Sequence, residues 1–300
     1  MPNKLVDVYY YFKHNNYPRI TNEELDSIVS DALKNTTPLM AGRLGATESA
    51  VLRMCEFNYI RKKEKCFNQL CMWSGFFPKQ ITLLDRFHDI YTRAISNADV
   101  VYPMLYKGEN YLLEKYTSPG VKYTKGNLFN TAGQCLWTRH LKGKKVLIIH
   151  PFEQTIKKQY AEKREKLHKN KDVLPEFELK TIKAVQTIAY EKDDRFNDWF
   201  EALDWMHDES LKVDYDIALI GCGAYGFPLA SMIKNDGKIA IHIGGSLQLM
   251  FGIKGMRWEM NPETVKQLYN DNWVYASDEE RPERFDLIEG SSYWQKPDKV

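Results

Sequence analysis

The stretch DIALIGCGAYGFPLASMIKNDGKIAIHIGG, residues 216–245, decides the fold class. It begins with an apolar run that ends at Ile220 and continues, after Gly226, with apolar residues at helical spacing. A second apolar run follows over residues 238–245. A buried strand, a helix and another buried strand make up a βαβ unit, whose two strands run parallel. The stretch therefore predicts an α/β protein with a mostly parallel sheet.

The same alternation extends along most of the chain. Further strands are predicted over 38–45, 99–104, 144–150 and 177–186, and helices over 46–57, 81–98, 155–168, 193–212 and 225–236. We interpret residues 1–37 as an N-terminal helical segment, 38–260 as a Rossmann-like three-layer domain, and 261–300 as an irregular C-terminal tail packed on it. Neither an internal repeat nor a low-complexity segment interrupts the pattern.

Composition narrows the class of protein. The 300 residues carry 42 basic and 40 acidic side chains, a net charge of +2, which is not typical of a nucleic-acid-binding protein. The N-terminus lacks the apolar segment of a signal peptide, and every apolar run is shorter than the roughly 18 residues of a membrane span. Five cysteines without a C-x-x-C pair indicate reduced thiols. These features predict a soluble, cytoplasmic protein that does not bind nucleic acid.

Three glycines in the opening stretch have the spacing G-x-G-x-x-G. Gly221, Gly223 and Gly226 follow a predicted strand and begin a helix, with Ala224 and Tyr225 inside the turn. Backbone amides at such a turn can bind a phosphate group. A nicotinamide site would also place an acidic residue at the end of the next strand. That strand ends in His242, Gly244 and Gly245 instead, so the turn favours another phosphate-bearing ligand or serves only the backbone.

Polar residues also follow the other predicted strands. Arg43, Gly45 and Glu48 follow the first, and His150 ends the strand over 144–150. Ligands of open α/β sheets bind beyond the carboxyl ends of the strands. A nucleotide sugar fits these groups, with Arg43 and helix-end amides on the diphosphate and Glu48 on a sugar hydroxyl or in proton transfer. The alternatives are structural histidines and a Glu48 that only stabilises a helix N-terminus.

Two basic segments have both a structural and a functional interpretation. The segment FGIKGMRW, 251–258, contains Lys254, Arg257 and Trp258, and is either a loop over the site with a sugar-stacking tryptophan or an ordinary surface loop. The lysine-rich helix over 155–168 is either a solvated face or a surface that touches an anionic membrane, where a lipid-linked acceptor would lie.

Several segments of the chain resemble a known protein family. GRLGATES, 42–49, is similar to the R-F-G-D-G-E segment of GT-D-fold glycosyltransferases, and residues 217–245 resemble their strand–glycine turn–helix–strand unit. From about residue 38 onward the chain resembles GT-D-like proteins of bacterial capsule and O-antigen clusters. The segments that carry this closer resemblance are KKVLIIHPFEQTIKKQY (144–160), LPEFELKTIKAVQ (174–186), DWFEALDWM (198–206), GCGAYGFPLA (221–230), GGSLQLMFGIKGMRW (244–258) and IEGSSYW (288–294).

The resemblance implies transfer of a sugar from a nucleotide-sugar donor to a surface-polysaccharide acceptor, at the inner face of the membrane. The chain departs from this family at one position. The enzymes have an Asp-x-Glu motif that serves donor and metal binding, and Ala46 stands in place of its aspartate here. A single carboxylate holds Mn²⁺ or Mg²⁺ weakly, so we expect no metal site unless another carboxylate substitutes, with Glu153 the nearest candidate. Two alternatives remain: a catalytically silent nucleotide- or glycan-binding subunit, which the missing aspartate favours, and an NAD(P)-dependent oxidoreductase.

Overall fold

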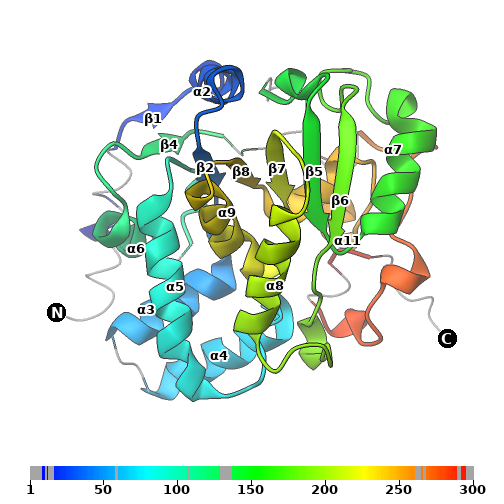
Figure 1. Cartoon of the computed structure of the whole chain (residues 1–300). Coiled ribbons are helices and arrows are strands. Elements are labelled where there is room, and N and C mark those ends of the chain that lie inside the picture. The colour runs from blue at the N-terminus through cyan, green and yellow to red at the C-terminus, as the bar shows by residue number, and fades with distance from the viewer. Residues whose placement is uncertain are drawn as a thin grey trace.

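The computed structural model describes residues 9–10, 12, 17–57, 60–106, 108–126, 128, 137–260, 265, 268–288 and 292–294. Within these residues, eight strands form one sheet in the order β1-β4-β3-β2-β8-β7-β5-β6. Every strand pair in the sheet is parallel. Figure 1 shows this twisted sheet with α5, α8 and α9 lying over it. The predicted Rossmann-like α/β class is confirmed.

The strands are short and mostly buried. Their bounds are β1 Arg19–Ile20, β2 Leu39–Gly42, β3 Val100–Val101, β4 Lys122–Thr124, β5 Lys145–His150, β6 Glu178–Lys183, β7 Ile217–Ile220 and β8 Ile239–His242. The α-helices are α2 Asn22–Asn35, α3 Ala46–Phe57, α4 Ile60–Ser74, α5 Leu84–Asn97, α6 Glu109–Tyr116, α7 Glu153–Leu167, α8 Trp199–Leu211, α9 Gly226–Asn235, α10 Leu247–Met250 and α11 Met256–Glu259.

Alternate residues of the central strands supply two separate cores. In β5, Leu147 and Ile149 pack into the core shared with α3, α4, α5, α8 and α9. Val146 and Ile148 point to the opposite core, shared with α2, α7 and α10. Side chains of a strand alternate between its two faces, and both faces here are covered by helices. This explains why the central strands are continuous apolar runs in the sequence.

Several element boundaries differ from the sequence-based expectation. The helix predicted over 193–212 begins only at Trp199, because the Asp198 side chain accepts hydrogen bonds from the N–H groups of Phe200 and Glu201 and caps the helix there. The stretch around 107–130, expected to be loop, contains α6 and β4. The described part of the N-terminal segment contains α2 and also adds β1 to the sheet by pairing with β4.

Candidate functional site

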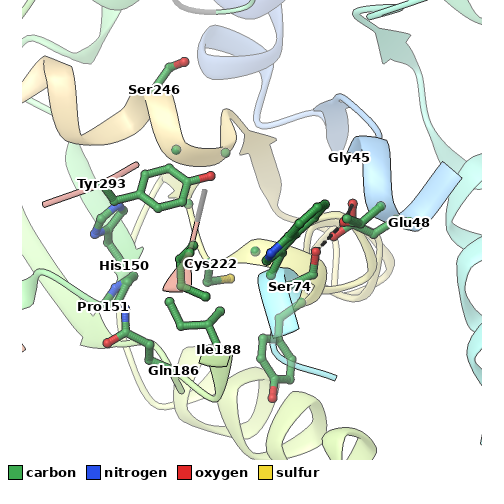
Figure 2. A pocket seen from close by; sticks show the side chains of 18 of the residues that line it. Gly45, Glu48, Ser74, His150, Pro151, Gln186, Ile188, Cys222, Ser246 and Tyr293 are labelled. Atoms are coloured by element: carbon green, nitrogen blue, oxygen red, sulfur yellow. Dashed lines mark hydrogen bonds between the residues drawn. The ribbon is translucent and has the colours of Figure 1, made fainter. Parts of the chain in front are cut away.

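A cavity of about 400 Å³ lies where several strands end. Its lining includes residues at or just after the carboxyl ends of β2, β5, β7 and β8, among them Arg43, His150, Gly221 and His242. In the sheet, β3, the next strand along the chain, lies on one side of β2. The last strand, β8, lies on the other side of β2. The crevice beyond the ends of β2 and β8 is thus the switch point at which α/β sheets bind ligands. Figure 2 shows His150 and Tyr293 on one side of this cavity, with Ser74 and Glu48 on the other.

The ends of β2 and β8 are tied together by two hydrogen bonds. His242 Nδ1 donates to the Arg43 carbonyl oxygen at 3.1 Å, and Arg43 Nε donates to the Ile243 carbonyl oxygen at 3.1 Å. Burial lowers the pKa of His242 to about 3, so its ring is neutral at physiological pH. Gly244 has a φ of +72°, and a Cβ there would lie 2.4 Å from Arg43 Nη2. Gly244 therefore provides the space for the Arg43 guanidinium at the cavity wall.

His150 presents a fixed tautomer to the cavity. Its Nδ1 accepts a hydrogen bond from the Phe152 N–H at 3.0 Å, so the ring proton is on Nε2. Burial lowers the pKa of His150 to about 3, and the ring stays neutral over the physiological range. His150 can act as a neutral hydrogen-bond donor to a ligand oxygen, and it is poorly suited to act as a general base.

Glu48 lies on the first turn of α3, almost fully buried and only 4% exposed, and it lines the cavity. Its Oε2 accepts a hydrogen bond from the Thr47 hydroxyl at 3.0 Å. The carboxylate folds back over Gly45, where a Cβ would lie 1.7 Å from Oε2. Gly45 is therefore required by the position of Glu48, and the structure brings Gly45, Glu48 and Arg43 together as predicted at one strand end.

The glycine turn divides into two parts. Gly223, with a φ of +58°, and Tyr225 line the cavity, as does Gly221. Gly226 instead makes room for a side chain, since a Cβ there would lie 2.3 Å from the His242 ring. Ala224 also does not line the cavity, and its carbonyl oxygen accepts a hydrogen bond from the Tyr91 hydroxyl at 2.5 Å.

The C-terminal part of the chain closes one side of the cavity. Arg257 and Trp258 line it, together with Tyr293, whose hydroxyl accepts a hydrogen bond from Arg257 Nη1 at 2.8 Å. Gly245 lines the cavity as well, and a Cβ on it would lie 2.5 Å from the Tyr293 ring. Lys254 does not line the cavity, because its ammonium group lies over the rings of Tyr269 and Tyr275.

Several lining residues were not identified from the sequence. They come from the end of α4, the segment after β3, the segment after β6 and the C-terminal segment: Trp73, Ser74, Met104, Tyr106, Gln186, Thr187, Tyr293 and Trp294. Two of these segments follow strands that the sequence did predict, so the strand-end argument could have included them. Ser74 and Tyr293 follow no strand, and nothing local in the sequence places them at the cavity.

The expected substitute for the missing aspartate lies elsewhere. Glu153, at the start of α7, accepts hydrogen bonds from Lys157 Nζ at 2.7 Å and from the Thr181 hydroxyl at 2.5 Å, and it does not line the cavity. Ala46 does line it. Within the part of the chain that the structure describes, no group of three or more His, Cys, Asp or Glu side chains is arranged to hold a metal ion.

The N-terminus of α7, directly after β5, already holds a carboxylate. Glu280, buried in the C-terminal segment, accepts hydrogen bonds from the Gln154 N–H at 2.7 Å and the Thr155 N–H at 3.2 Å. A helix N-terminus favours an anion, and Glu280 supplies it here. The N-terminus of α7 is therefore not available to a ligand phosphate group.

Comparison with solved structures finds two distant likenesses. One structure, described as "Selenomethionine substituted structure of domain of unknown function 1792 (DUF1792)", is 10% identical, with a TM-score of 0.49 over 91% of this chain and 96% of that chain. Another, described as "The highly conserved domain of unknown function 1792 has a distinct glycosyltransferase fold", is 11% identical, with a TM-score of 0.40 over the same shares, 91% and 96%. No protein-family model and no curated protein sequence matches the chain. Likeness at this level assigns no activity to this chain.

Among the described residues, no helix combines the length and the apolar character needed to cross a membrane.

Proposed function

We propose that the protein is a glycosyltransferase that moves a sugar from a nucleotide-sugar donor to a glycan acceptor. The observation that carries the proposal is the cavity at the switch point, which brings Arg43, a fixed neutral donor at His150 and the buried carboxylate of Glu48 to one place. An arginine binds a diphosphate through charge-assisted hydrogen bonds, and a carboxylate can remove the proton from an acceptor hydroxyl.

The wall of the cavity that contains Trp258 and Tyr293 suits a sugar ring. Trp258 and Tyr293 line it with their rings 6.1 Å apart between centroids, and Arg257 lies over both rings. Aromatic faces pack against the apolar faces of sugars while nearby polar groups bind the hydroxyls. We place a sugar ring of the acceptor against these two side chains, with its reacting hydroxyl directed across the cavity toward Glu48. From the family resemblance of the sequence we further propose that the acceptor is a surface polysaccharide or is linked to a lipid. The protein would then act at the inner face of the membrane.

A panel of ligands tests the function. Thermal unfolding is measured with uridine, guanosine and cytidine diphosphates, their sugar conjugates and NAD(P), because a ligand that binds the native state raises the melting temperature. We expect a nucleotide diphosphate or its sugar conjugate to stabilise the protein and NAD(P) to have no effect. Stabilisation by NAD(P) alone would contradict the proposal and favour an oxidoreductase.

Product detection separates an enzyme from a silent subunit, the alternative that Ala46 favours. The donor that stabilises the protein is incubated with it and with bacterial glycan acceptors, and released nucleotide diphosphate is measured together with the glycosylated acceptor. We expect both products in equal amounts. Tight donor binding without release of nucleotide by the wild-type protein would identify a binding subunit instead.

A further inference from the structure

Two hydroxyl groups form a chain of hydrogen bonds with Glu48 at the wall of the cavity. The Thr47 hydroxyl contacts Glu48 Oε2 at 3.0 Å, and it is also hydrogen-bonded to the Ser74 hydroxyl. Thr47 and Glu48 belong to the first turn of α3, whereas Ser74 is the last residue of α4. Ser74 lines the cavity (Figure 2), so the three groups form a short chain from the cavity to the carboxylate.

The chemistry of the groups fixes the direction of this chain. A carboxylate has acceptor atoms only, so the Thr47 hydroxyl must be the donor to Glu48. A hydroxyl has one proton, so the Thr47 oxygen can then only accept from Ser74. Ser74 therefore points its proton toward Thr47 and leaves its oxygen lone pairs available on the cavity side. Ser74 is prepared to accept a hydrogen bond from a ligand hydroxyl.

We propose that Ser74 and Thr47 relay a proton from the acceptor hydroxyl to Glu48, an inference that rests on the proposed function. Ser74 and Glu48 both line the cavity, and Ser74, at 7% exposed, is slightly less buried than Glu48, at 4%. Tyr91 also lines the cavity, but its hydroxyl donates to the Ala224 carbonyl oxygen at 2.5 Å. Ser74 is then the catalytic residue that touches the acceptor, and Thr47 positions it and passes the proton on.

The step balances in atoms and charge. The acceptor O–H bond breaks as its oxygen forms a bond to the anomeric carbon of the donor. The bond from that carbon to the diphosphate breaks, and the electron pair leaves with the nucleotide diphosphate beside Arg43. The acceptor proton moves to the Ser74 oxygen, the Ser74 proton moves to Thr47, and the Thr47 proton moves to Glu48, which becomes a neutral carboxylic acid.

Thr47→Val tests the relay, because valine has the shape of threonine without the hydroxyl. We expect kcat to fall at least about tenfold, with the donor KM and the thermal stability nearly unchanged. Thr47→Ser, which restores a hydroxyl, should recover most of the rate, and Ser74→Ala should lower kcat as Thr47→Val does. The matched control is Thr138→Val, which removes the hydroxyl of a different threonine, one that donates to the Asp172 carbonyl oxygen at 2.6 Å near the amino end of β5.

The outcomes separate the relay from the function. A Thr47→Val variant that transfers sugar at the wild-type rate overturns the relay and leaves the glycosyltransferase intact. A loss of rate that Thr47→Ser fails to restore, or that follows a loss of thermal stability, shows a structural contact between α3 and α4 and also overturns the relay. A wild-type protein that transfers no sugar overturns the proposed function, and the relay with it.

Discussion

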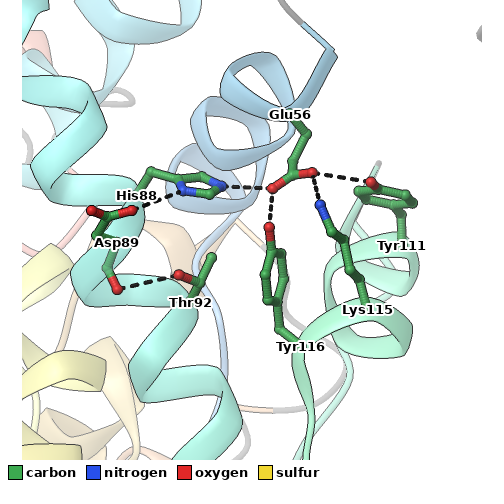
Figure 3. A network of polar contacts seen from close by, with 7 residues as sticks. All are labelled: Glu56, His88, Asp89, Thr92, Tyr111, Lys115 and Tyr116. Atoms are coloured by element: carbon green, nitrogen blue, oxygen red, sulfur yellow. Dashed lines mark hydrogen bonds and ion pairs between the residues drawn. The ribbon is translucent and has the colours of Figure 1, made fainter.

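The two ends of helix α3 each carry a buried glutamate, and the two glutamates differ in their partners. Glu56, in the last turn, has a side chain only 6% exposed and accepts hydrogen bonds from Lys115, Tyr116, Tyr111 and His88 (Figure 3). Glu48, in the first turn, accepts a hydrogen bond from the Thr47 hydroxyl and faces the cavity.

The number of hydrogen-bond donors around a buried carboxylate distinguishes a structural role from a chemical one. Donors on α5 and α6 surround the Glu56 carboxylate, so Glu56 links three helices. Burial raises the pKa of Glu56, but the hydrogen bonds, that of Lys115 first, outweigh burial and lower the pKa to about 2. The acceptor capacity of Glu48 is largely unused by the protein, which leaves the carboxylate able to take up a proton at the cavity. We therefore propose that Glu56 serves stability and that Glu48 serves catalysis.

The largest expected effect is on turnover at the Glu48 end. Glu48→Gln keeps the size of the side chain and removes the charge, so sugar transfer should fall about a hundredfold to ten-thousandfold, because a positioned general base contributes that much. Initial rates measure the change, and the melting temperature of the variant shows whether it is folded. Unchanged turnover would place Glu48 with Glu56 among the structural carboxylates.

At the other end of α3 the expected effect is on stability alone. Glu56→Gln leaves Lys115 without its anion and should lower the free energy of unfolding by about 2 kcal/mol, the size of a hydrogen bond to a charged group. Chemical denaturation measures it, and the transfer rate of the folded variant should stay within about twofold of the wild type. A variant with full stability and lost transfer would reverse the assignment of the two ends.

The pH dependence of stability tests whether the charge of Glu56 stabilises the fold. The pKa of Glu56 is about 2 in the folded protein and about 4.5 when unfolded, so its stabilising effect is present above pH 4.5 and is lost as the pH falls toward 2. The stability difference between wild type and Glu56→Gln should therefore shrink between pH 6 and pH 3 in denaturation curves. A constant difference over that range would show that the carboxylate charge is not the cause.

The smallest expected effect concerns divalent cations at the Glu48 end. Ala46 cannot coordinate a cation, and Glu48 alone would leave most of the coordination shell to water and phosphate oxygens. We propose that turnover in a chelator stays within about threefold of turnover in millimolar manganese. A large, saturable manganese requirement would make Glu48 a metal ligand rather than a base.

Much of the fold could be predicted from the sequence, because its central strands are unbroken apolar runs and its helices have clear periodicity. Helix α3 has the predicted bounds, 46–57. The two-residue strand β1 and the helix α4 were missed, since a strand so short has no pattern of its own and no strong signal marks α4. The start of α8 was misplaced because the capping hydrogen bonds of Asp198 outweigh the helical pattern before it.

The candidate site was predictable only in part. The residues after β2, β5, β7 and β8 do meet at one cavity, because parallel strands end at the same edge of the sheet. The glycines could not be assigned from their spacing, since Gly226 and Gly244 make room for His242 and Arg43. Ser74 arrives from the end of α4 and Tyr293 from the C-terminal segment, contacts that depend on tertiary packing.

Donor binding tests the central claim most directly, namely that the switch-point cavity binds a nucleotide diphosphate through Arg43. Titration calorimetry with the nucleotide diphosphate selected by the thermal panel compares the wild type with Arg43→Ala and with Arg93→Ala, a control that removes an exposed arginine of α5. We expect Arg43→Ala to weaken binding about tenfold to a hundredfold, as the loss of a charge-assisted hydrogen bond requires, and Arg93→Ala to leave it unchanged. Equal affinity of Arg43→Ala and the wild type, with both proteins folded, would contradict the account.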